Sequence, residues 1–117
     1  MVTVYGLKNC DSCRKARKFL KERDIHYTFH DVRTDGVDIQ MLERWADRVG
    51  WEKLVNKKSL TWRTVPEKAR QDLNRNKALA LILSEPTLLK RPVLEGKDFT
   101  AIGFSEKRFT EYLGRNT

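Results

Sequence analysis

Two cysteines separated by two residues are the part of this sequence best suited to chemistry. They are the only cysteines in the chain and form the motif Cys10-Asp11-Ser12-Cys13. A thiolate is a strong nucleophile, and two thiols at this spacing can form and break a disulfide. The motif therefore favours redox chemistry over a chance occurrence.

Other uses of the motif fit the sequence poorly. A structural zinc site needs four ligands, and the two histidines, His26 and His30, stand at least thirteen residues beyond Cys13, without the usual finger spacing. A structural disulfide is disfavoured in a reducing cytosol, and so small a loop would remove little entropy from the unfolded chain. We therefore expect no metal site and no bound cofactor.

The flanking residues predict different environments for the two thiols. The run Val2–Gly6 is typical of a buried strand, and apolar residues then recur at helical spacing up to about Arg23. Cys10 is expected at the helix N-terminus, where free N–H groups and the positive dipole end favour a thiolate. Cys13 lies one turn further on and faces inward. We interpret Cys10 as the nucleophile and Cys13 as a thiol that can resolve a mixed disulfide.

Positive charge is concentrated around the motif. The chain carries 24 Lys and Arg against 16 Asp and Glu, a net charge of +8, which attracts anionic partners. Residues 8–23 contain seven of the basic and two of the acidic side chains. Asp11 opposes a low thiol pKa at Cys10, whereas Lys8, Arg14 and Lys15 favour one. A solvated helix face would give the same pattern.

The two ends of the chain predict sheet elements. Residues Ile25–His30 alternate in polarity, as in a half-buried strand with both histidines on a solvent-facing side. Strand, helix and strand imply a parallel pair with a right-handed crossover. Near the C-terminus, Val93–Leu94 and Phe99–Ile102 flank the tight turn Glu95–Asp98 as a hairpin. A last amphipathic helix begins near Ser105.

The middle of the chain, about residues 38–90, predicts a helical insert. One helix ends at Gly50, a residue favoured just after a helix. Residues 51–64 then show little periodicity and mix basic residues with Trp51 and Trp62. This mixture could stack on nucleic acid, but core anchors and long side chains of an insert are the favoured interpretation.

Two more helices are expected in the insert. Thr64-Val65-Pro66-Glu67 has the spacing of a capping box, which predicts a helix from about Pro66 to Leu73. Another follows over about Arg75–Ser84 and ends before Pro86. The order is thus βαβ, helical insert and ββα, within one domain of 117 residues.

This order favours an α/β fold with a mixed four-stranded sheet, similar to thioredoxin. The longest apolar stretch, Ala78–Leu83, has six residues, far fewer than the roughly 20 needed to cross a bilayer. Met1–Gly6 lacks the basic region and cleavage site of a secretory signal. We therefore expect a cytoplasmic protein without a membrane partner.

Several separated segments also carry a family resemblance. On these segments the chain resembles the ArsC family of thioredoxin-like proteins, and closely its YffB branch, over essentially its whole length. The segments are Val4–Cys10, Arg14–Arg17, Gly50–Glu52, Thr61–Arg63, Lys90–Pro92 and Gly103–Ser105.

The resemblance implies roles for residues distant from the motif. Cys10 would be the nucleophilic thiol, Arg91 would lie beside it, and Pro92 would be the proline, commonly cis in this fold, that faces the active cysteine. A guanidinium there would stabilise a thiolate or hold an anionic substrate. Lys8 and Asn9 join Arg91 and Pro92 in the expected substrate site.

The YffB branch implies a glutathione-dependent thiol reductase. Cys10 would attack a disulfide or another oxidised substrate, and Cys13 or glutathione would resolve the mixed disulfide. Glutathione is thus the expected co-substrate, a protein disulfide is an alternative substrate, and nucleic acid is not an expected partner.

Two related activities remain as alternatives. Spx-type regulators resemble the chain at Ser12–Arg17, use a Cys-x-x-Cys as a redox switch and bind RNA polymerase. Arsenate reductases of the family hold the oxyanion with three arginines, of which only Arg91 matches. The other positions fall near Asn56 or Lys57 and near Gly103, so arsenate reduction is the least favoured activity.

Overall fold

The computed structural model describes residues 2–115, which divide into two compact units. The first unit contains the segments up to Asp31 and from Arg91 onward, and the second is Val32–Lys90. The predicted insert at about 38–90 falls inside the second unit. That the two units form a single domain stays a prediction.

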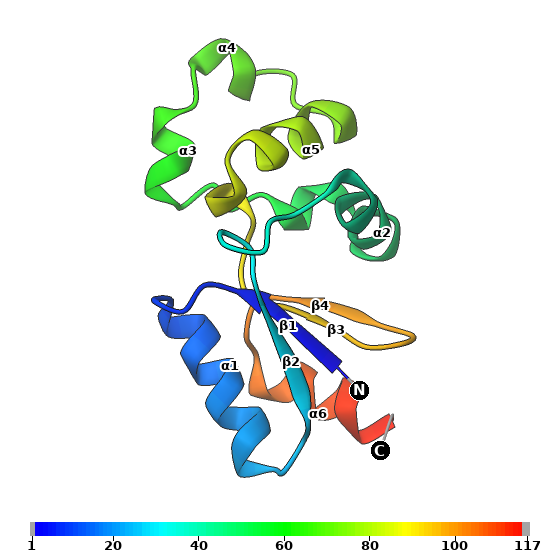
Figure 1. Cartoon of the computed structure of the whole chain (residues 1–117). Helices are drawn as coiled ribbons and strands as arrows, with labels where there is room; N and C mark the ends of the chain where they lie inside the picture. The colour runs from blue at the N-terminus through cyan, green and yellow to red at the C-terminus, as the bar shows by residue number, and fades with distance from the viewer. Residues whose placement is uncertain (1, 116–117) are drawn as a thin grey trace. The chain divides into compact units, whose positions relative to one another are not determined.

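The first unit is built on a mixed four-stranded sheet (Figure 1). The strand order is β2-β1-β3-β4; β1 pairs in parallel with β2 and antiparallel with β3, and β3 pairs antiparallel with β4. The fold is therefore the predicted thioredoxin-like α/β arrangement. The strands are β1 (Val2–Gly6), β2 (Tyr27–Asp31), β3 (Val93–Glu95) and β4 (Thr100–Ile102).

Two amphipathic helices, α1 (Asp11–Glu22) and α6 (Glu106–Arg115), share one core with the sheet. Alternate residues of β1 point into this core because side chains alternate between the faces of a strand. Phe109 of α6 is fully buried and packs edge-to-face on Phe19 of α1, with ring centres 5.9 Å apart. The buried members of the core are Val2, Val4, Ala16, Phe19, Leu20, Leu94, Phe99, Ala101, Phe109 and Leu113.

The second strand begins two residues later than predicted, because the residues directly after α1 form hydrogen bonds to the last turn of that helix. Asp24 adopts a positive φ of 54°, and its N–H donates to the carbonyl of Lys21 at 3.1 Å. The N–H of Ile25 donates to the carbonyl of Leu20 at 3.0 Å. These paired bonds are those of a Schellman motif, which places Ile25 against the core instead of in the strand.

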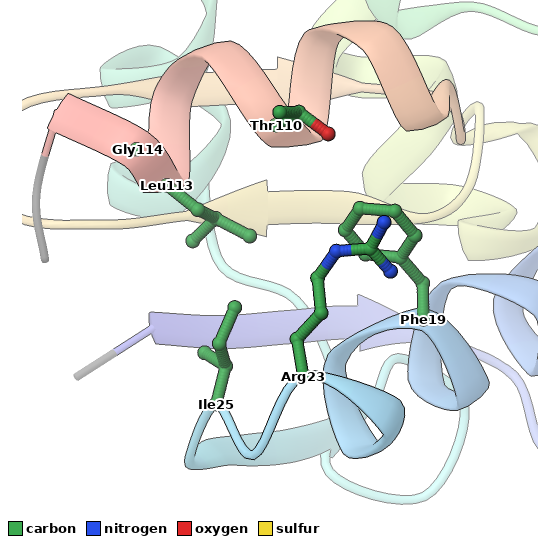
Figure 2. Close-up of a pocket in the computed structure, with 6 residues that line it drawn as sticks. All are labelled: Phe19, Arg23, Ile25, Thr110, Leu113 and Gly114. Carbon is green, nitrogen blue, oxygen red and sulfur yellow. The ribbon is translucent and has the colours of Figure 1, made fainter.

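The same region forms a small pocket between the ends of α1 and α6 (Figure 2). Ile25 and Leu113 supply aliphatic walls, and the guanidinium of Arg23 lies 3.6 Å from the centre of the Phe19 ring. Such a contact combines cation–π attraction with burial of the arginine stem. Arg23 thereby covers one side of Phe19 at the end of the helix.

The two histidines do not share a strand face as predicted. His26 is exposed and precedes β2, whereas His30 lies within β2 and is half-buried. The His30 ring centre is 4.9 Å from that of Tyr5 on the neighbouring strand. The prediction failed because β2 begins at Tyr27, so that His26 lies outside the strand and His30 lies within it.

The second unit is helical (Figure 1). Helix α2 begins after Asp38, whose carboxylate accepts from the Met41 N–H at 2.8 Å, and it ends before Gly50, as predicted. Helix α5 is capped by Asn74 in the same way and spans the predicted residues. The elements are α2 (Ile39–Val49), η1 (Trp51–Leu54), α3 (Leu60–Thr64), α4 (Glu67–Arg70), α5 (Arg75–Ser84) and η2 (Pro86–Leu88).

The predicted helix over about Pro66–Leu73 is wrong in length and capping. The observed α4 has four residues, because Gln71 directly after it has an extended backbone with φ −75° and ψ 146°, and Asp72 then adopts a positive φ of 52°. Thr64 does not cap α4, because it is the last residue of α3 and its hydroxyl donates to the Thr61 carbonyl at 2.7 Å. The cap that the sequence reasoning missed is Ser59, which accepts from the Trp62 N–H.

Backbone pairings and an ion pair link elements of the second unit, whose buried side chains include Leu42, Trp45 and Ile82. Val55 and Leu89 form an antiparallel bridge, and Lys90 N–H donates to the Leu54 carbonyl at 2.8 Å. Arg75 of α5 lies 2.8 Å from the Asp47 carboxylate of α2. None of the helices within residues 2–115 is long and apolar enough to cross a membrane.

Candidate active site

Cys10 stands at the junction between β1 and α1, as predicted. Its backbone is extended, with φ −127° and ψ 121°, and α1 begins at the next residue. Its carbonyl accepts the N–H of Arg14 at 2.9 Å, the first hydrogen bond of the helix. The thiol is therefore presented at the end where free N–H groups and the helix dipole favour negative charge.

Cys13 is fully buried one turn further along α1. A Cβ atom placed on Gly6 would lie only 2.5 Å from the Cys13 Sγ, closer than real side chains approach. Gly6 is in a strand and has no positive φ, so the requirement for glycine is steric. The missing side chain leaves the space in which the Cys13 thiol packs against β1.

We expect Gly6→Ala to destabilise the protein by about 1–3 kcal/mol, because the added methyl group overpacks a well-filled site. Chemical denaturation would measure the loss. In a Cys13→Ala background the same change should cost less, since the closest atom is gone. The matched control is Gly114→Ala on α6, where nothing lies within 4 Å of the new methyl group. Equal losses with and without the Cys13 sulfur would contradict the steric explanation.

The pKa of Cys10 lies below its ordinary value of 9.0. Partial burial is the largest single influence and acts to raise the pKa of Cys10, whereas hydrogen bonds from the Cys13 side chain and backbone lower it. A hydrogen bond from Arg91 and the positive charge of its guanidinium lower the pKa of Cys10 further. The surroundings of Cys10 thus favour a reactive thiolate.

The pKa of Cys13 is shifted in the opposite direction. Burial raises the pKa of Cys13 to about 12, and the neighbouring Cys10 adds to this effect. The backbone N–H of Leu7 and the charge of Arg91 act in the other direction but do not compensate. Cys13 therefore keeps its proton and donates a hydrogen bond to the Cys10 thiolate.

The basic residues of α1 support Cys10 less than the sequence suggested. Arg14 lies 2.7 Å from the Asp11 carboxylate, so these two exposed charges offset each other beside the thiol. The cation that lowers the Cys10 pKa is Arg91, which is 81 residues away in sequence and lies two residues before the start of β3. Pairing of β3 with β1 brings the two segments together.

We expect Arg91→Ala to raise the Cys10 pKa and to slow alkylation near neutral pH, because the thiolate loses a hydrogen bond and a positive charge. The melting temperature should change little. Alkylation rates measured against pH would give the pKa, and Arg91→Lys, which keeps the charge, should recover part of the shift. A lower melting temperature with an unchanged thiol pKa would show that Arg91 is structural.

The other residues of the expected substrate site are less closely tied to the thiols. Lys8 and Asn9 are exposed on the turn between β1 and Cys10, and the shifts of the two thiol pKa values arise from other groups. Pro92 is buried and follows Arg91 through a cis peptide bond, and its carbonyl accepts the Gly103 N–H at 2.8 Å. Roles for these three residues in substrate binding stay predictions.

Sequence reasoning missed two contributions to the site, both from the end of β1. They are the space at Gly6 and the N–H of Leu7, which acts on the Cys13 thiol. A glycine at the end of the predicted strand, four residues before Cys10, was a visible signal for the first. The second had none, because every residue except proline carries an N–H group.

The model of the ArsC family matches residues 5–112, which include both cysteines and Arg91. The chain belongs to the ArsC family. An uncharacterized protein of Haemophilus influenzae is 42% identical over 109 residues, covering 93% of this chain and 96% of that protein. The solved structure of the YFFB protein is 37% identical with a TM-score of 0.92, covering 95% of this chain and 97% of that one.

A transcriptional regulator is also among the relatives of this ArsC-family chain. The global transcriptional regulator Spx of Lactiplantibacillus plantarum is 26% identical over 117 residues, covering 98% of this chain and 88% of that protein. The family resemblance inferred from separated segments is confirmed by the family model, the Haemophilus influenzae relative and the YFFB structure. Because membership of a fold family does not by itself determine function, the activity follows from the chemistry of the site.

Proposed function

We propose that this ArsC-family protein is a thiol–disulfide oxidoreductase that uses glutathione, with Cys10 as its nucleophile. The observation that carries the proposal is the opposite shift of the two thiol pKa values, lowered at Cys10 and raised to about 12 at Cys13. A partly exposed thiolate beside a guanidinium has the features of a catalytic cysteine. Such a reaction suits the cytoplasm, where reduced thiols are maintained.

The reaction needs only sulfur chemistry. The Cys10 thiolate attacks one sulfur of a substrate disulfide, the substrate S–S bond breaks, and the other half leaves as a thiolate. A glutathione thiolate then attacks the mixed disulfide on Cys10. When the group held on Cys10 is itself glutathione, this step releases glutathione disulfide and regenerates the Cys10 thiolate.

The raised Cys13 pKa favours glutathione over Cys13 as the resolving thiol. A thiol with a pKa of about 12 is almost fully protonated at neutral pH, and the thiolate is the attacking species. The part of the shift that Cys10 causes disappears once Cys10 is in a mixed disulfide, but burial of Cys13 remains. Resolution by Cys13 is therefore the slower route.

A trapping experiment tests the proposal. Cys13→Ser protein is incubated with glutathione disulfide, quenched in acid and digested, and the peptide that carries the adduct is identified by mass spectrometry. We expect one glutathione on Cys10, released by added glutathione. Cys10→Ser protein is the control and should acquire none on Cys13. Failure of Cys10 to form the adduct would refute the assignment.

We expect negligible arsenate turnover when glutathione and glutaredoxin are supplied. A charged oxyanion needs several fixed donors, each hydrogen bond to a charged group contributing about 1.5–3 kcal/mol, and Arg91 is the one matching arginine. At the third position Gly103 has no side chain to donate. Coupled NADPH oxidation would measure turnover, and saturable arsenate-dependent oxidation would contradict the expectation.

A redox-switch regulator is the second candidate, supported by the Spx relatives that match nearly the whole chain. In that case an intramolecular disulfide between Cys10 and Cys13 would change binding to RNA polymerase, and no substrate would be turned over. A pull-down from cell lysate distinguishes the two functions. Stoichiometric recovery of RNA polymerase, dependent on the redox state of the bait, would favour the regulator.

A further inference from the structure

A pocket of about 280 Å³ on the outer face of α1 is lined mostly by cations. Its lining contains four basic side chains and one hydroxyl, and none of these side chains is acidic. We call this surface the basic strip; it consists of Arg14, Arg17, Lys18, Lys21 and Tyr27.

The basic strip is linear and begins one helical turn after Cys10. Arg14 and Lys21 are seven residues apart on α1, which is about 10 Å along a helix axis. Intermediate members lie three or four residues from both ends and so share one helix face. Arg14 is also the residue whose N–H binds the Cys10 carbonyl. The strip therefore begins one helical turn after Cys10, and a ligand lying on it would have one end about 6 Å along the helix axis from Cys10.

Part of the strip is already fixed in place. The Arg17 Nε donates to the Tyr27 hydroxyl at 3.2 Å, and its guanidinium lies 4.3 Å from the centre of the Phe29 ring. A side chain held in this way loses little conformational entropy when it binds a ligand.

The other contacts of the strip are easily exchanged. Arg14 pairs with Asp11, and Lys18 lies 3.8 Å from Glu22, all with exposed side chains. Exposed pairs of this kind contribute little stability, so an incoming carboxylate can replace them at small cost.

The form of the strip selects among anions. A single oxyanion is best held by donors that converge, whereas these cations are spread along a line and match a row of carboxylates. Single-stranded nucleic acid is usually held by exposed rings on which bases stack. Here Arg17 covers the ring of Phe29, and Tyr27 is half-buried. An acidic protein segment fits these features best.

We propose that the basic strip docks an acidic segment of a partner protein and thereby presents a disulfide of that partner to Cys10. Docking is inferred from the arrangement of basic side chains on α1. Presentation to Cys10 also rests on the proposed function, in which Cys10 is the nucleophile. Complementary charge along such a surface increases association rates by about 10- to 1,000-fold at low salt.

Binding is tested with a fluorescein-labelled peptide of alternating Glu and Ala and a matched peptide with Gln for Glu. With Cys10→Ser protein we expect anisotropy to show binding of the Glu peptide alone, weakened by salt. Adding Lys18→Gln and Lys21→Gln to this protein should weaken binding of the Glu peptide about 10-fold, as expected for the loss of two surface charges. The control pair Lys53→Gln and Lys58→Gln removes equal charge outside the strip and should have little effect.

Three binding results would overturn the docking proposal. They are equal affinity for the Glu and Gln peptides, equal affinity of the strip and control variants, and tighter binding of a single-stranded oligonucleotide of the same charge. The last result would assign the strip to nucleic acid.

Presentation to Cys10 is tested with the same peptides carrying a terminal cysteine as a mixed disulfide with thionitrobenzoate. Attack by the Cys10 thiolate forms a Cys10–peptide disulfide and breaks the peptide–thionitrobenzoate bond, releasing the coloured thiolate. We expect release to be about 10-fold faster from the Glu peptide at low salt. Equal release from both peptides would refute presentation to Cys10, whereas binding without any release by wild-type protein would refute the proposed thiol reaction and leave docking intact.

Discussion

At pH 6.5, limiting iodoacetamide is expected to alkylate Cys10 of the reduced protein at least about 30-fold faster than Cys13. The pKa of Cys10 is below 9.0 and that of Cys13 is about 12, so their thiolate fractions differ by more than about 10³-fold. A thiolate of lower pKa is intrinsically less nucleophilic, with a Brønsted slope of about 0.5. This lower nucleophilicity reduces the expected ratio of alkylation rates from about 10³ to about 30. Burial of Cys13 slows its reaction with iodoacetamide further and so increases the ratio of the two alkylation rates.

Mass spectrometry of the peptide that contains both cysteines would measure the ratio, with fragmentation assigning the modified residue. Denatured protein is the control, because unfolding removes both shifts and should bring the two rates close together. Preferential alkylation of Cys13, or equally slow alkylation of both thiols in the native protein, would remove the assignment of Cys10 as nucleophile.

Cys10→Ser is expected to abolish reductase activity, at least about 10³-fold, since a serine hydroxyl is not ionised at neutral pH and cannot form the mixed disulfide. Cys13→Ser should retain glutathione-dependent activity, because glutathione can resolve the mixed disulfide without it. Reduction of 2-hydroxyethyl disulfide by glutathione, coupled to glutathione reductase and NADPH oxidation, would measure both variants.

The Cys13→Ser variant decides the resolving step. Activity that stays first order in glutathione would support resolution by glutathione. If Cys13→Ser is as inactive as Cys10→Ser while its fold is intact, Cys13 is obligatory and a two-cysteine mechanism replaces the one proposed. Circular dichroism and melting temperatures of both variants are the controls for folding.

The sheet and its helices could be predicted from sequence because their signals are local. Period-two alternation, helical spacing of apolar residues and the turn at Glu95–Asp98 depend on neighbours in the chain. Prediction failed where a backbone exception intervened. The positive φ of Asp24 at the end of α1 delayed β2, and aspartate tolerates this conformation without revealing it in the sequence pattern. Helix α4 is short because Gln71 is already extended, and the positive φ of Asp72 follows it.

Within the site, sequence alone predicted the position of Cys10 and the inward orientation of Cys13, which follow from the spacing of α1. The contribution of Arg91 could not be derived from spacing, since strand pairing brings it to the thiol from 81 residues away. Family resemblance supplied it instead. The strength of the local basic residues was overestimated because Arg14 engages Asp11, a pairing that charge counts do not reveal.

The opposed thiol environments also link folding to proton uptake. Between the lowered pKa of Cys10 and 9.0, unfolding makes Cys10 take up a proton, so its contribution to stability rises with pH and is complete above 9.0. Between 9.0 and about 12, unfolding releases the proton of Cys13, so its contribution is present below 9.0 and is lost as pH rises toward 12. Together the two thiols stabilise the fold most near pH 9.0, where one is anionic and the other protonated.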